Sequence, residues 1–418
     1  MKKTVIELFA GVGGFRVGLN DIKNFDKNGK AIENRDWDFV WANQWEPATK
    51  TQHAFDCYVK RFGAAHASNK DISTVNKFQD IPKHTLLVGG FPCQDYSVAR
   101  TLSGEKGIEG KKGVLFWQIA EILGAKMTPF VLLENVDRLL KSPSKQRGRD
   151  FGIMLRTFSD LGYNIEWRIV NAAEYGAAQR RRRVFIFGWR QNTKHNNEIT
   201  RYTPQQILEK EGLFASQFPI KTFENPEKEI HNIDLLKYED TVEMTDHFKA
   251  EFANSGVMLN GTVYTAKSTS VKEPAITIRQ IRESEKDLSK YILTSAQEEK
   301  FQFLRGSKKI ERIRPNGEIY YYSEGAMAYP DNLDLPGRTM LTSEKSINRS
   351  THVIEDELTG KNRFLTPIEA ERLQSFPDDW TNTGMPENRR YFMMGNALVT
   401  KMINRLENKL SEIIENED

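Results

Sequence analysis

The chain has 418 residues, of which 39% are hydrophobic and 28% are charged, so two or three folded domains are expected. No stretch of about 18 apolar residues occurs, which excludes a membrane span at the level of sequence. The formal net charge is only +3, so any surface that binds nucleic acid must be a local basic patch.

The cysteine and histidine content limits the chemistry further. The two cysteines, Cys57 and Cys93, exclude a disulfide framework and favour a reducing cytoplasm. The chain begins directly with a strand pattern instead of a signal peptide, which agrees with that compartment. No Cys-x-x-Cys or His-x-x-x-His spacing occurs, so no metal site is expected.

The first predicted element is a strand at residues 5–9, followed by a glycine turn and a helix that begins near Arg16. A strand, a glycine turn and a helix start form a nucleotide-binding corner, because backbone N–H groups and the helix dipole face the ligand. Arg16 occupies the third glycine position of the dinucleotide fingerprint. The pattern therefore favours an adenosine whose tail is not a pyrophosphate.

The second predicted strand covers residues 39–42 and ends at Gln44, Trp45 and Glu46. A carboxylate at this position typically binds ribose hydroxyls in doubly wound folds. Trp45 either stacks on adenine or packs in the core. Asp71, which precedes Ile72, either reaches the adenine amino group or caps a turn. Cys57 lies in the intervening helix and is expected to be buried and inert.

The third predicted strand, residues 86–88, leads through two glycines and Pro92 to Cys93 and Gln94. Ligands of open α/β sheets bind at the carboxyl ends of strands, so Cys93 is a candidate nucleophile. The alternative is a small buried apolar side chain. A loop rich in glycine and basic residues follows and suits an anionic partner.

A predicted helix that includes Leu115 precedes an apolar strand at residues 130–133, which ends at Glu134. Buried glutamates are rare unless they are paired or functional, so Glu134 is a candidate acid; the alternative is a helix cap. Four consecutive arginines lie between two closing strands. Alternation along a strand would point Arg181 and Arg183 together into the site, with the other two arginines outward.

From residue 191 the parallel-sheet pattern stops and short strands are expected, at residues 275–278 and 319–322. Thr366, Pro367 and Glu369 predict a capped helix. After Asn396 the last helix carries an apolar stripe that needs a partner. We therefore expect an α/β fold with a doubly wound, mostly parallel sheet in residues 1–190, completed by helix 386–418, and a second, smaller, irregular domain at 191–385.

Several of these stretches form an ordered motif set that resembles the cytosine-5 DNA methyltransferases of bacterial restriction-modification systems. In chain order they are Phe-Ala-Gly-Val-Gly-Gly (9–14), Gly-Phe-Pro-Cys-Gln (90–94), Glu-Asn-Val (134–136), Gln-Arg-Arg-Arg-Arg (179–183), Leu-Thr-Pro-Ile-Glu-Ala-Glu-Arg-Leu-Gln-Ser-Phe-Pro (365–377) and Gly-Asn-Ala-Leu-Val (395–399). Residues 191–335 match nothing, where the family has its target recognition domain. The family usually has an acidic residue immediately before the tryptophan at the end of strand two. In this chain that position is occupied by Gln44, and Glu46 follows Trp45, so either Gln44 or Glu46 would hold the ribose.

The resemblance implies a Rossmann-like fold, S-adenosylmethionine as cofactor, S-adenosylhomocysteine as product and a flipped-out cytosine of double-stranded DNA as substrate. Cys93 would add to C6 of the cytosine, and Glu134, kept protonated by burial, would bind its N3. Arg181 would hold the O2 atom of the base, and Arg183 would support the loop that carries Cys93. Gln94 belongs to the same motif as Cys93. The implied cofactor pocket is Phe9, Ala10, Gly11, Val12, Gly13, Gly14, Gln44, Trp45, Glu46, Asp71, Ile72, Pro92, Leu115, Asn396 and Leu398.

The recognition edge and the partners are expectations of the same kind. Two Thr-hydrophobic pairs, Thr277-Ile278 and Thr339-Met340, are candidates for base reading, and the second fits the family better. We expect a monomer in the cytoplasm, associated with the nucleoid; a companion restriction endonuclease for the same site fits this type of enzyme. The alternatives are a tRNA cytosine-5 methyltransferase with the same core and a non-catalytic DNA-binding scaffold.

Overall fold

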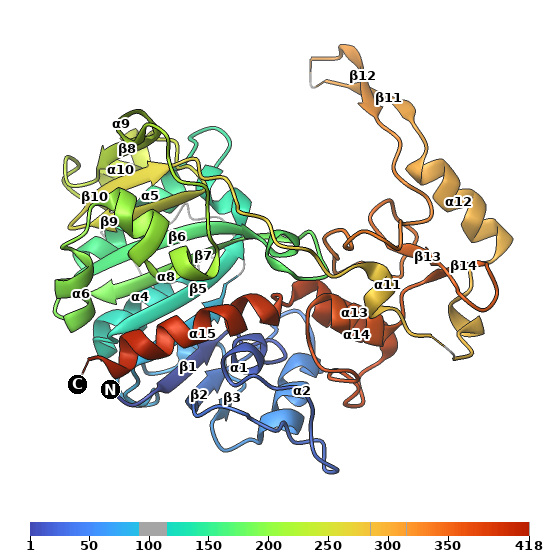
Figure 1. Cartoon of the computed structure of the whole chain (residues 1–418), viewed down its shortest axis with the longest axis horizontal. Coiled ribbons are helices and arrows are strands. Elements are labelled where there is room, and N and C mark those ends of the chain that lie inside the picture. The colour runs from blue at the N-terminus through green and yellow to red at the C-terminus, as the bar shows by residue number, and fades with distance from the viewer. Residues whose placement is uncertain (92–114, 285, 315, 418) are drawn as a thin grey trace.

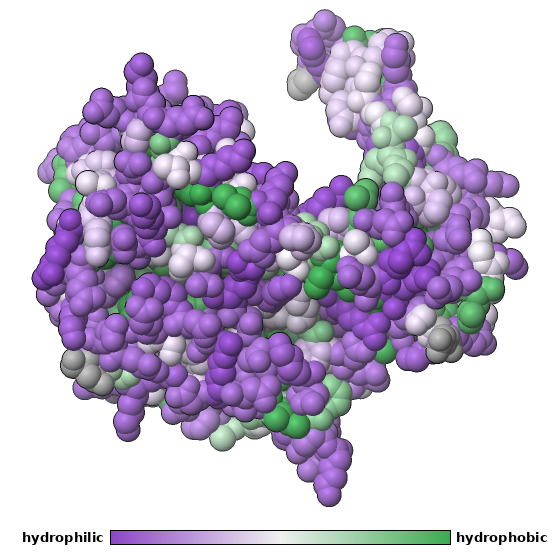
Figure 2. Space-filling model, viewed as in Figure 1, coloured by the Kyte–Doolittle hydropathy of each residue, from purple (hydrophilic) through white to green (hydrophobic). Residues whose placement is uncertain are grey.

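The computed structural model describes residues 1–91, 115–284, 286–314 and 316–417. The chain folds into a large lobe built on one sheet and a smaller lobe of loops, short helices and two small sheets (Figure 1). In the described part of the chain no helix is both long and apolar enough to cross a membrane. Figure 2 shows an open, mainly hydrophilic cleft between the two lobes.

The large lobe is organised on a ten-stranded sheet with the order β3-β2-β1-β4-β5-β7-β6-β9-β10-β8. Strands β1 to β5 pair in parallel, and β7 then pairs antiparallel with both β5 and β6. Because β6 and β10 again run in the direction of β1, most strands share one orientation. The strands are β1 (Thr4–Leu8), β2 (Asp38–Asn43), β3 (Ala67–Ser68), β4 (Leu86–Gly90), β5 (Phe130–Val136), β6 (Tyr163–Asn171), β7 (Arg182–Arg190), β8 (Ile230–Asp234), β9 (Ser255–Leu259) and β10 (Thr262–Ala266).

The sheet does not end at residue 190, where we expected the second domain to begin. Strands β8, β9 and β10 extend it, because β9 pairs antiparallel with β6 and β10 pairs with β9 and β8. The sequence of β10 hides this role, because an antiparallel strand near an edge can alternate buried and partly exposed residues instead of forming an apolar run. In β10, Val263 is buried while Thr262 and Tyr264 are partly exposed. The expected boundary therefore lies inside the large lobe.

Helices cover both faces of the sheet, which confirms the doubly wound α/β class. The helices α4 (Leu115–Lys126) and α5 (Arg149–Asp160) share one core with Ile6 and Leu8 of β1. On the other face, α1 (Gly14–Leu19), α8 (Leu213–Gln217) and α15 (Thr400–Glu415) share a core with Val5. Alternate residues of one strand thus serve two different cores.

The last helix returns to the large lobe, as its apolar stripe predicts. The side chains of Met402, Leu406, Leu410 and Ile414 are almost completely buried and pack in the same core as Phe15 and Leu19 of α1. Burying such a side chain contributes about 1.5–3 kcal/mol, so the stripe fixes the carboxyl-terminal segment to the first strand and helix of the chain. The segment before this helix, which contains Asn396 and Leu398, is thereby held near the carboxyl ends of the strands.

The smaller lobe shares one core with the large lobe, in which Ile278, Leu373 and Trp380 pack with Val12 and Cys57, and it has a small core of its own around Phe301. It projects a hairpin formed by β11 and β12 (Figure 1). Thr366 caps α13 with the predicted capping box. The strand expected at residues 275–278 is absent; Thr277 instead caps a short helix. The lobe consists of α11 (Ile278–Ile281), η5 (Ser289–Tyr291), α12 (Ser295–Arg305), β11 (Lys308–Ile313), β12 (Ile319–Glu324), β13 (Val353–Glu355), β14 (Asn362–Phe364), α13 (Pro367–Leu373) and α14 (Glu387–Asn396).

The remaining elements belong to the large lobe. They are α2 (His53–Phe62), η1 (Ile72–Thr74), η2 (Asp137–Lys141), η3 (Ala172–Tyr175), α6 (Lys194–Ile199), α7 (Pro204–Gln206), η4 (Ile207–Glu211), α9 (Pro226–Glu229) and α10 (Thr241–His247). Cys57 lies on α2 and is fully buried, as the sequence predicts.

Candidate active site

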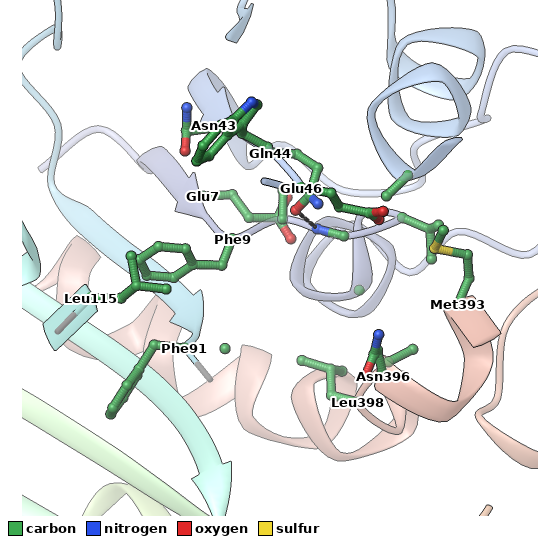
Figure 3. Close-up of a pocket in the computed structure, with 18 of the residues that line it drawn as sticks. Glu7, Phe9, Asn43, Gln44, Glu46, Phe91, Leu115, Met393, Asn396 and Leu398 are labelled. Carbon is green, nitrogen blue, oxygen red and sulfur yellow. Dashed lines mark hydrogen bonds between the residues drawn. The ribbon is translucent and has the colours of Figure 1, made fainter. Parts of the chain in front are cut away.

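A cavity of about 630 Å³ opens at the carboxyl ends of β1, β2, β4 and β5. Figure 3 shows Glu7, Gln44 and Glu46 on one side of it and Met393, Asn396 and Leu398 on the other. Both α14 and the segment before α15 contribute to its wall. Ligands of open α/β sheets bind at this edge, so the cavity is the candidate active site.

The glycine turn after β1 shapes one wall of the cavity. Phe9, Gly11 and Gly13 all have positive φ angles, of 54°, 54° and 88°. A Cβ atom added to Gly11 would meet nothing within 4 Å, so the backbone is open to a ligand there. Gly14 instead lies close to Leu398, 3.1 Å from where its Cβ would be. Of the predicted turn residues, Phe9, Ala10, Gly11, Val12 and Gly14 line the cavity, and Gly13 caps α1.

Three residues that follow β2 also line the cavity. The Gly11 N–H donates a hydrogen bond of 2.7 Å to Oε1 of Gln44, so Gln44 holds the glycine turn. Trp45 is 38% exposed, so it is not a core residue. Glu46 forms an ion pair with Arg389 of α14, with 2.9 Å between Oε2 and Nη2.

Asp71 has the capping role that the sequence left open, and its contact with adenine stays a prediction. Its Oδ1 accepts hydrogen bonds from the backbone N–H of Ser73 at 3.0 Å and from the hydroxyl of Ser73 at 2.8 Å, which caps η1. Asp71 also lines the cavity, together with the buried Ile72 and with Leu115 at the start of α4. Asn396 and Leu398 complete the set from the carboxyl-terminal side.

The strand that leads to the predicted nucleophile ends beside Glu134. Gly90, the last residue of β4, pairs in register with Glu134 of β5. The carbonyl of Phe91 accepts a hydrogen bond of 2.9 Å from Nδ2 of Asn135, which fixes the chain as it leaves the sheet. Pro92, Cys93 and Gln94 lie outside the described residues.

Glu134 forms an ion pair that the sequence analysis did not anticipate. Nε of Arg183 lies 3.0 Å from Oε1 of Glu134. Because Val136 pairs with Arg183 in the antiparallel register of β5 and β7, Glu134 and Arg183 are diagonal neighbours on one face. We expected Arg183 to support the Cys93 loop and burial to act on Glu134; in the structure, Arg183 contacts Glu134 directly.

Arg181 lies at the base of the cavity and is only 3% exposed. Its two Nη atoms donate to the backbone carbonyls of Met340 and Gly395, at 3.1 and 3.0 Å. Burial and the nearby charge of Arg183 lower the pKa of the Arg181 side chain to about 9. Among the described residues none accepts a hydrogen bond from its Nε, which is buried. Arg180 and Arg182 are exposed.

A segment of the smaller lobe lies against these arginines. Gly337 N–H donates to the Ala178 carbonyl at 2.7 Å, and Arg180 N–H donates to the Gly337 carbonyl at 2.8 Å. The Met340 N–H donates to Oε1 of Gln179 at 2.9 Å. The hydroxyl of Thr339 donates to the Arg180 carbonyl at 2.7 Å. We call residues 337–340 the docking segment; sequence reasoning noted the Thr-Met pair but not this role.

Two charged residues that line the cavity, Glu7 and Arg389, were not predicted from the sequence. Glu7 of β1 is fully buried and accepts hydrogen bonds from the Phe15 N–H at 3.1 Å and from the Tyr58 hydroxyl at 3.3 Å. Burial raises the pKa of the Glu7 carboxyl to about 8. An acidic residue inside an apolar strand was the available signal. Arg389 gave none, because its partner Glu46 lies more than 300 residues away in sequence.

The doubly wound sheet with a glycine turn at its first strand defines an α/β protein with a cavity at its strand ends, the edge where ligands of such sheets bind. A family model described as C-5 cytosine-specific DNA methylase matches residues 3–412. The chain therefore belongs to this family and is a DNA cytosine-5 methyltransferase.

Curated relatives agree with this assignment, and a solved structure shares the fold. The chain is 51% identical to the Type II methyltransferase M.Sau3AI of Staphylococcus aureus over 413 residues, which cover 99% of this chain and 96% of that protein. It is 36% identical to the Type II methyltransferase M.NgoBI of Neisseria gonorrhoeae over 50% of this chain and 55% of that protein. The fold resembles the crystal structure of S. pombe Dnmt2 methyltransferase, with a TM-score of 0.58 and 16% identity over 99% of this chain and 98% of that one.

Proposed function

We propose that the chain transfers a methyl group from S-adenosylmethionine to C5 of a flipped-out cytosine within a specific sequence of double-stranded DNA, with Cys93 as the nucleophile. The observation that carries this proposal is the register of β4 and β5. It brings the strand that leads to Cys93 beside Glu134, in the cavity that Arg181 also lines.

The cavity fits the cofactor in size and in chemistry. Phe9, Trp45, Ile72 and Leu115 offer aromatic and apolar surface for an adenine ring. The carboxylates of Glu46 and Asp71 offer acceptors for hydroxyl or amino groups, and the open backbone at Gly11 allows close approach of a polar tail. When bound, S-adenosylmethionine supplies the electrophilic methyl group.

The protein must make C5 of cytosine nucleophilic. The Cys93 thiolate adds to C6, and the electron pair moved by this addition makes C5 an enamine carbon that can attack the methyl group. Loss of the C5 proton then allows Cys93 to be eliminated. None of these steps is possible in a stacked duplex, so the base must leave the helix.

Glu134 and Arg181 would recognise and activate the flipped base. Arg183 holds Oε1 of Glu134, which leaves Oε2 near Gly90 to face N3 of the base and to carry the proton that stabilises it. The buried Nε of Arg181 lacks an acceptor among the described residues, and the O2 carbonyl of cytosine would supply one. An unpaired buried donor is costly, so it favours a ligand with a carbonyl at that point.

The experiment that tests this proposal is covalent trapping. The fluorine of 5-fluorocytosine cannot be removed as a proton would be, so Cys93 stays bonded to C6 after methyl transfer. We expect duplex DNA with 5-fluorocytosine at the target position and S-adenosylmethionine to give an adduct that survives denaturing electrophoresis, with the DNA on the peptide that contains Cys93. Absence of an adduct would favour a non-catalytic scaffold, and efficient transfer to tRNA instead of duplex DNA would favour a tRNA enzyme.

The biological setting is part of the same proposal. The relatives above are named Type II methyltransferases, which supports a role in restriction-modification with a companion endonuclease for the same site. We infer a cytoplasmic monomer that acts at the nucleoid, because its DNA substrate is there. Bisulfite sequencing of plasmid from an expressing host would identify the target sequence and the cytosine that is methylated.

A further inference from the structure

The end of β2 departs from the family pattern, and the structure indicates how the chain accommodates this. Gln44 occupies the position where an acidic residue is usual. Its acceptor atom Oε1 is already engaged by the Gly11 N–H at 2.7 Å. An uncharged amide oxygen suits this neutral donor, so Gln44 serves to hold the glycine turn. Its amide N–H groups and one remaining lone pair of Oε1 are left for a ligand, and both are uncharged.

Glu46 lies two residues further along and lines the same cavity (Figure 3). Its backbone is clamped by Gln52: the Glu46 N–H donates to Gln52 Oε1 at 2.8 Å, and Gln52 Nε2 donates to the Glu46 carbonyl at 2.9 Å. Its Oε2 accepts from Arg389 Nη2 at 2.9 Å and from the Thr49 hydroxyl at 3.3 Å. No described residue donates to Oε1, so that oxygen is left for a ligand.

Arg389 reaches Glu46 from the opposite wall of the cavity. It lies in the first turn of α14, and its guanidinium carbon is 4.4 Å from the ring centroid of Phe392. Both residues line the cavity. The Nε of Arg389 is buried without an acceptor in the described part of the chain, so the guanidinium is held by stacking and by Glu46. The ion pair therefore connects β2 to the carboxyl-terminal segment across the cavity.

We propose that Glu46 accepts the ribose hydroxyls of the cofactor and that Arg389 is its positioning residue. This inference rests on the proposed function, since it assumes an S-adenosyl cofactor in this cavity. Hydrogen bonds from hydroxyls to a carboxylate are charge-assisted and stronger than those to an amide. Arg389 holds one carboxylate oxygen in place before the ligand arrives, which reduces the side-chain entropy lost on binding.

The test measures binding of S-adenosylhomocysteine to the full-length protein by calorimetry, without DNA and without turnover. A second ligand, its 2′,3′-dideoxyribosyl analogue, lacks both hydroxyls. We expect Glu46→Ala to weaken binding of the natural ligand about tenfold or more, as loss of a charge-assisted bond implies. The same change should leave binding of the analogue unaltered. Gln44→Ala should weaken both ligands alike, because its role is to hold the turn.

Because Arg389 acts through Glu46, the effects of substituting the two residues should not be additive, and a double-mutant cycle measures this. Arg389→Ala should weaken the natural ligand several-fold in the wild-type background and have no further effect beside Glu46→Ala. Arg389→Lys should recover part of the loss. The control is Arg279→Ala, on the exposed surface of the smaller lobe, which should change neither affinity.

Two outcomes would overturn the inference. A loss with Glu46→Ala that is equal for both ligands would remove the ribose assignment, and a hydroxyl-dependent loss with Gln44→Ala would give the role to Gln44. Either result leaves the proposed function intact, because the wild-type chain still binds the ligand. Failure of the wild-type chain to bind S-adenosylhomocysteine would contradict the cofactor assignment and this inference together.

Discussion

Two antiparallel strand pairs of the molecule differ sharply in their surroundings. In the pair β5–β7, Leu133 and Ile186 face each other in the sheet and are completely buried. In the hairpin β11–β12, Ile313 and Ile319 also face each other, yet they are 68% and 56% exposed. A two-stranded sheet without a core is only marginally stable in water. Glu134 and Arg183, which form an ion pair in the cavity, thus lie on the strand pair that is packed on both sides.

The largest expected effect concerns Cys93, the proposed nucleophile. Cys93→Ala should abolish methyl transfer and leave binding of target DNA intact, because only the thiolate can add to C6. Methyl transfer from labelled cofactor and a gel-shift measurement would separate the two properties. Cys57→Ala is the matched control: burial raises the pKa of the Cys57 thiol to about 12, so this thiol cannot replace the nucleophile. Equal activity of both variants would remove the assignment.

Exchange of the exposed lobe should change which sequence is methylated. We expect a chimera that takes residues 278–335 from a relative of different specificity to methylate the relative's sequence. The reason is that contacts with the bases determine which sequence is bound, whereas contacts with phosphates only position the protein, and we expect residues 278–335 to make the base contacts. A chimera that begins at residue 191 should instead fail to fold, since it replaces β9, which pairs with β6. Bisulfite sequencing reports the site. An active chimera that keeps the original site would place recognition outside residues 278–335.

Substitution of Glu134, the proposed acid, tests the role of the buried strand pair β5–β7. Glu134→Gln keeps the shape of the side chain but cannot supply the proton, so turnover should fall about 10²–10⁴-fold. Binding of S-adenosylhomocysteine should change little, because Glu134 faces the base. Single-turnover rates at saturating DNA would measure the effect. A rate equal to that of the wild type would show that the ion pair with Arg183 is only structural.

Glu7 offers a pH-dependent test of burial in the sheet. Its folded-state pKa of about 8 lies above the ordinary value of a carboxyl group, so folding favours the protonated form. Its contribution to stability is complete below the ordinary pKa and is lost as the pH rises towards 8. The wild type should therefore lose stability over this window relative to Glu7→Gln. Thermal unfolding of both proteins across pH 4–9 checks this, and parallel curves would contradict it.

The smallest effect should come from the hairpin. Ile319→Ala removes an exposed side chain and should change the free energy of unfolding by less than about 0.5 kcal/mol. Ile186→Ala, its counterpart in β7, should cost about 2–5 kcal/mol because it leaves a cavity in a packed core. Urea unfolding of the two variants measures both values. Equal losses would mean that the hairpin is packed against something in solution.

Local patterns predicted the parts of the structure that depend on near neighbours. The capping box at Thr366 and the apolar stripe of α15 were read from the sequence and are confirmed. The same kind of reasoning was wrong for residues 275–278, where β-branched side chains suggested a strand although Thr277 and Gln280 form a capping box. The spacing of Thr277 and Gln280 could have predicted the helix start, but the β-branched composition of the stretch was given more weight.

Contacts that depend on register or on distant segments could not be predicted in this way. The Glu134–Arg183 ion pair follows from how β7 is aligned with β5, which no single stretch of sequence specifies. The place of β9 and β10 in the large sheet depends likewise on pairing with β6. The arginines were recognised as site candidates, but the backbone carbonyls of Met340 and Gly395 that hold Arg181 carry no sequence signal at all.

The docking segment has a consequence for how such enzymes diversify. Gly337 and Arg180 are joined through backbone atoms, and Arg181 is held by the backbone carbonyl of Met340. Main-chain hydrogen bonds do not depend on the identity of the side chains that carry them. Mutation can therefore alter the side chains of the smaller lobe, which we propose to read the DNA sequence, while these main-chain hydrogen bonds keep the lobe joined to the segment that carries Arg181.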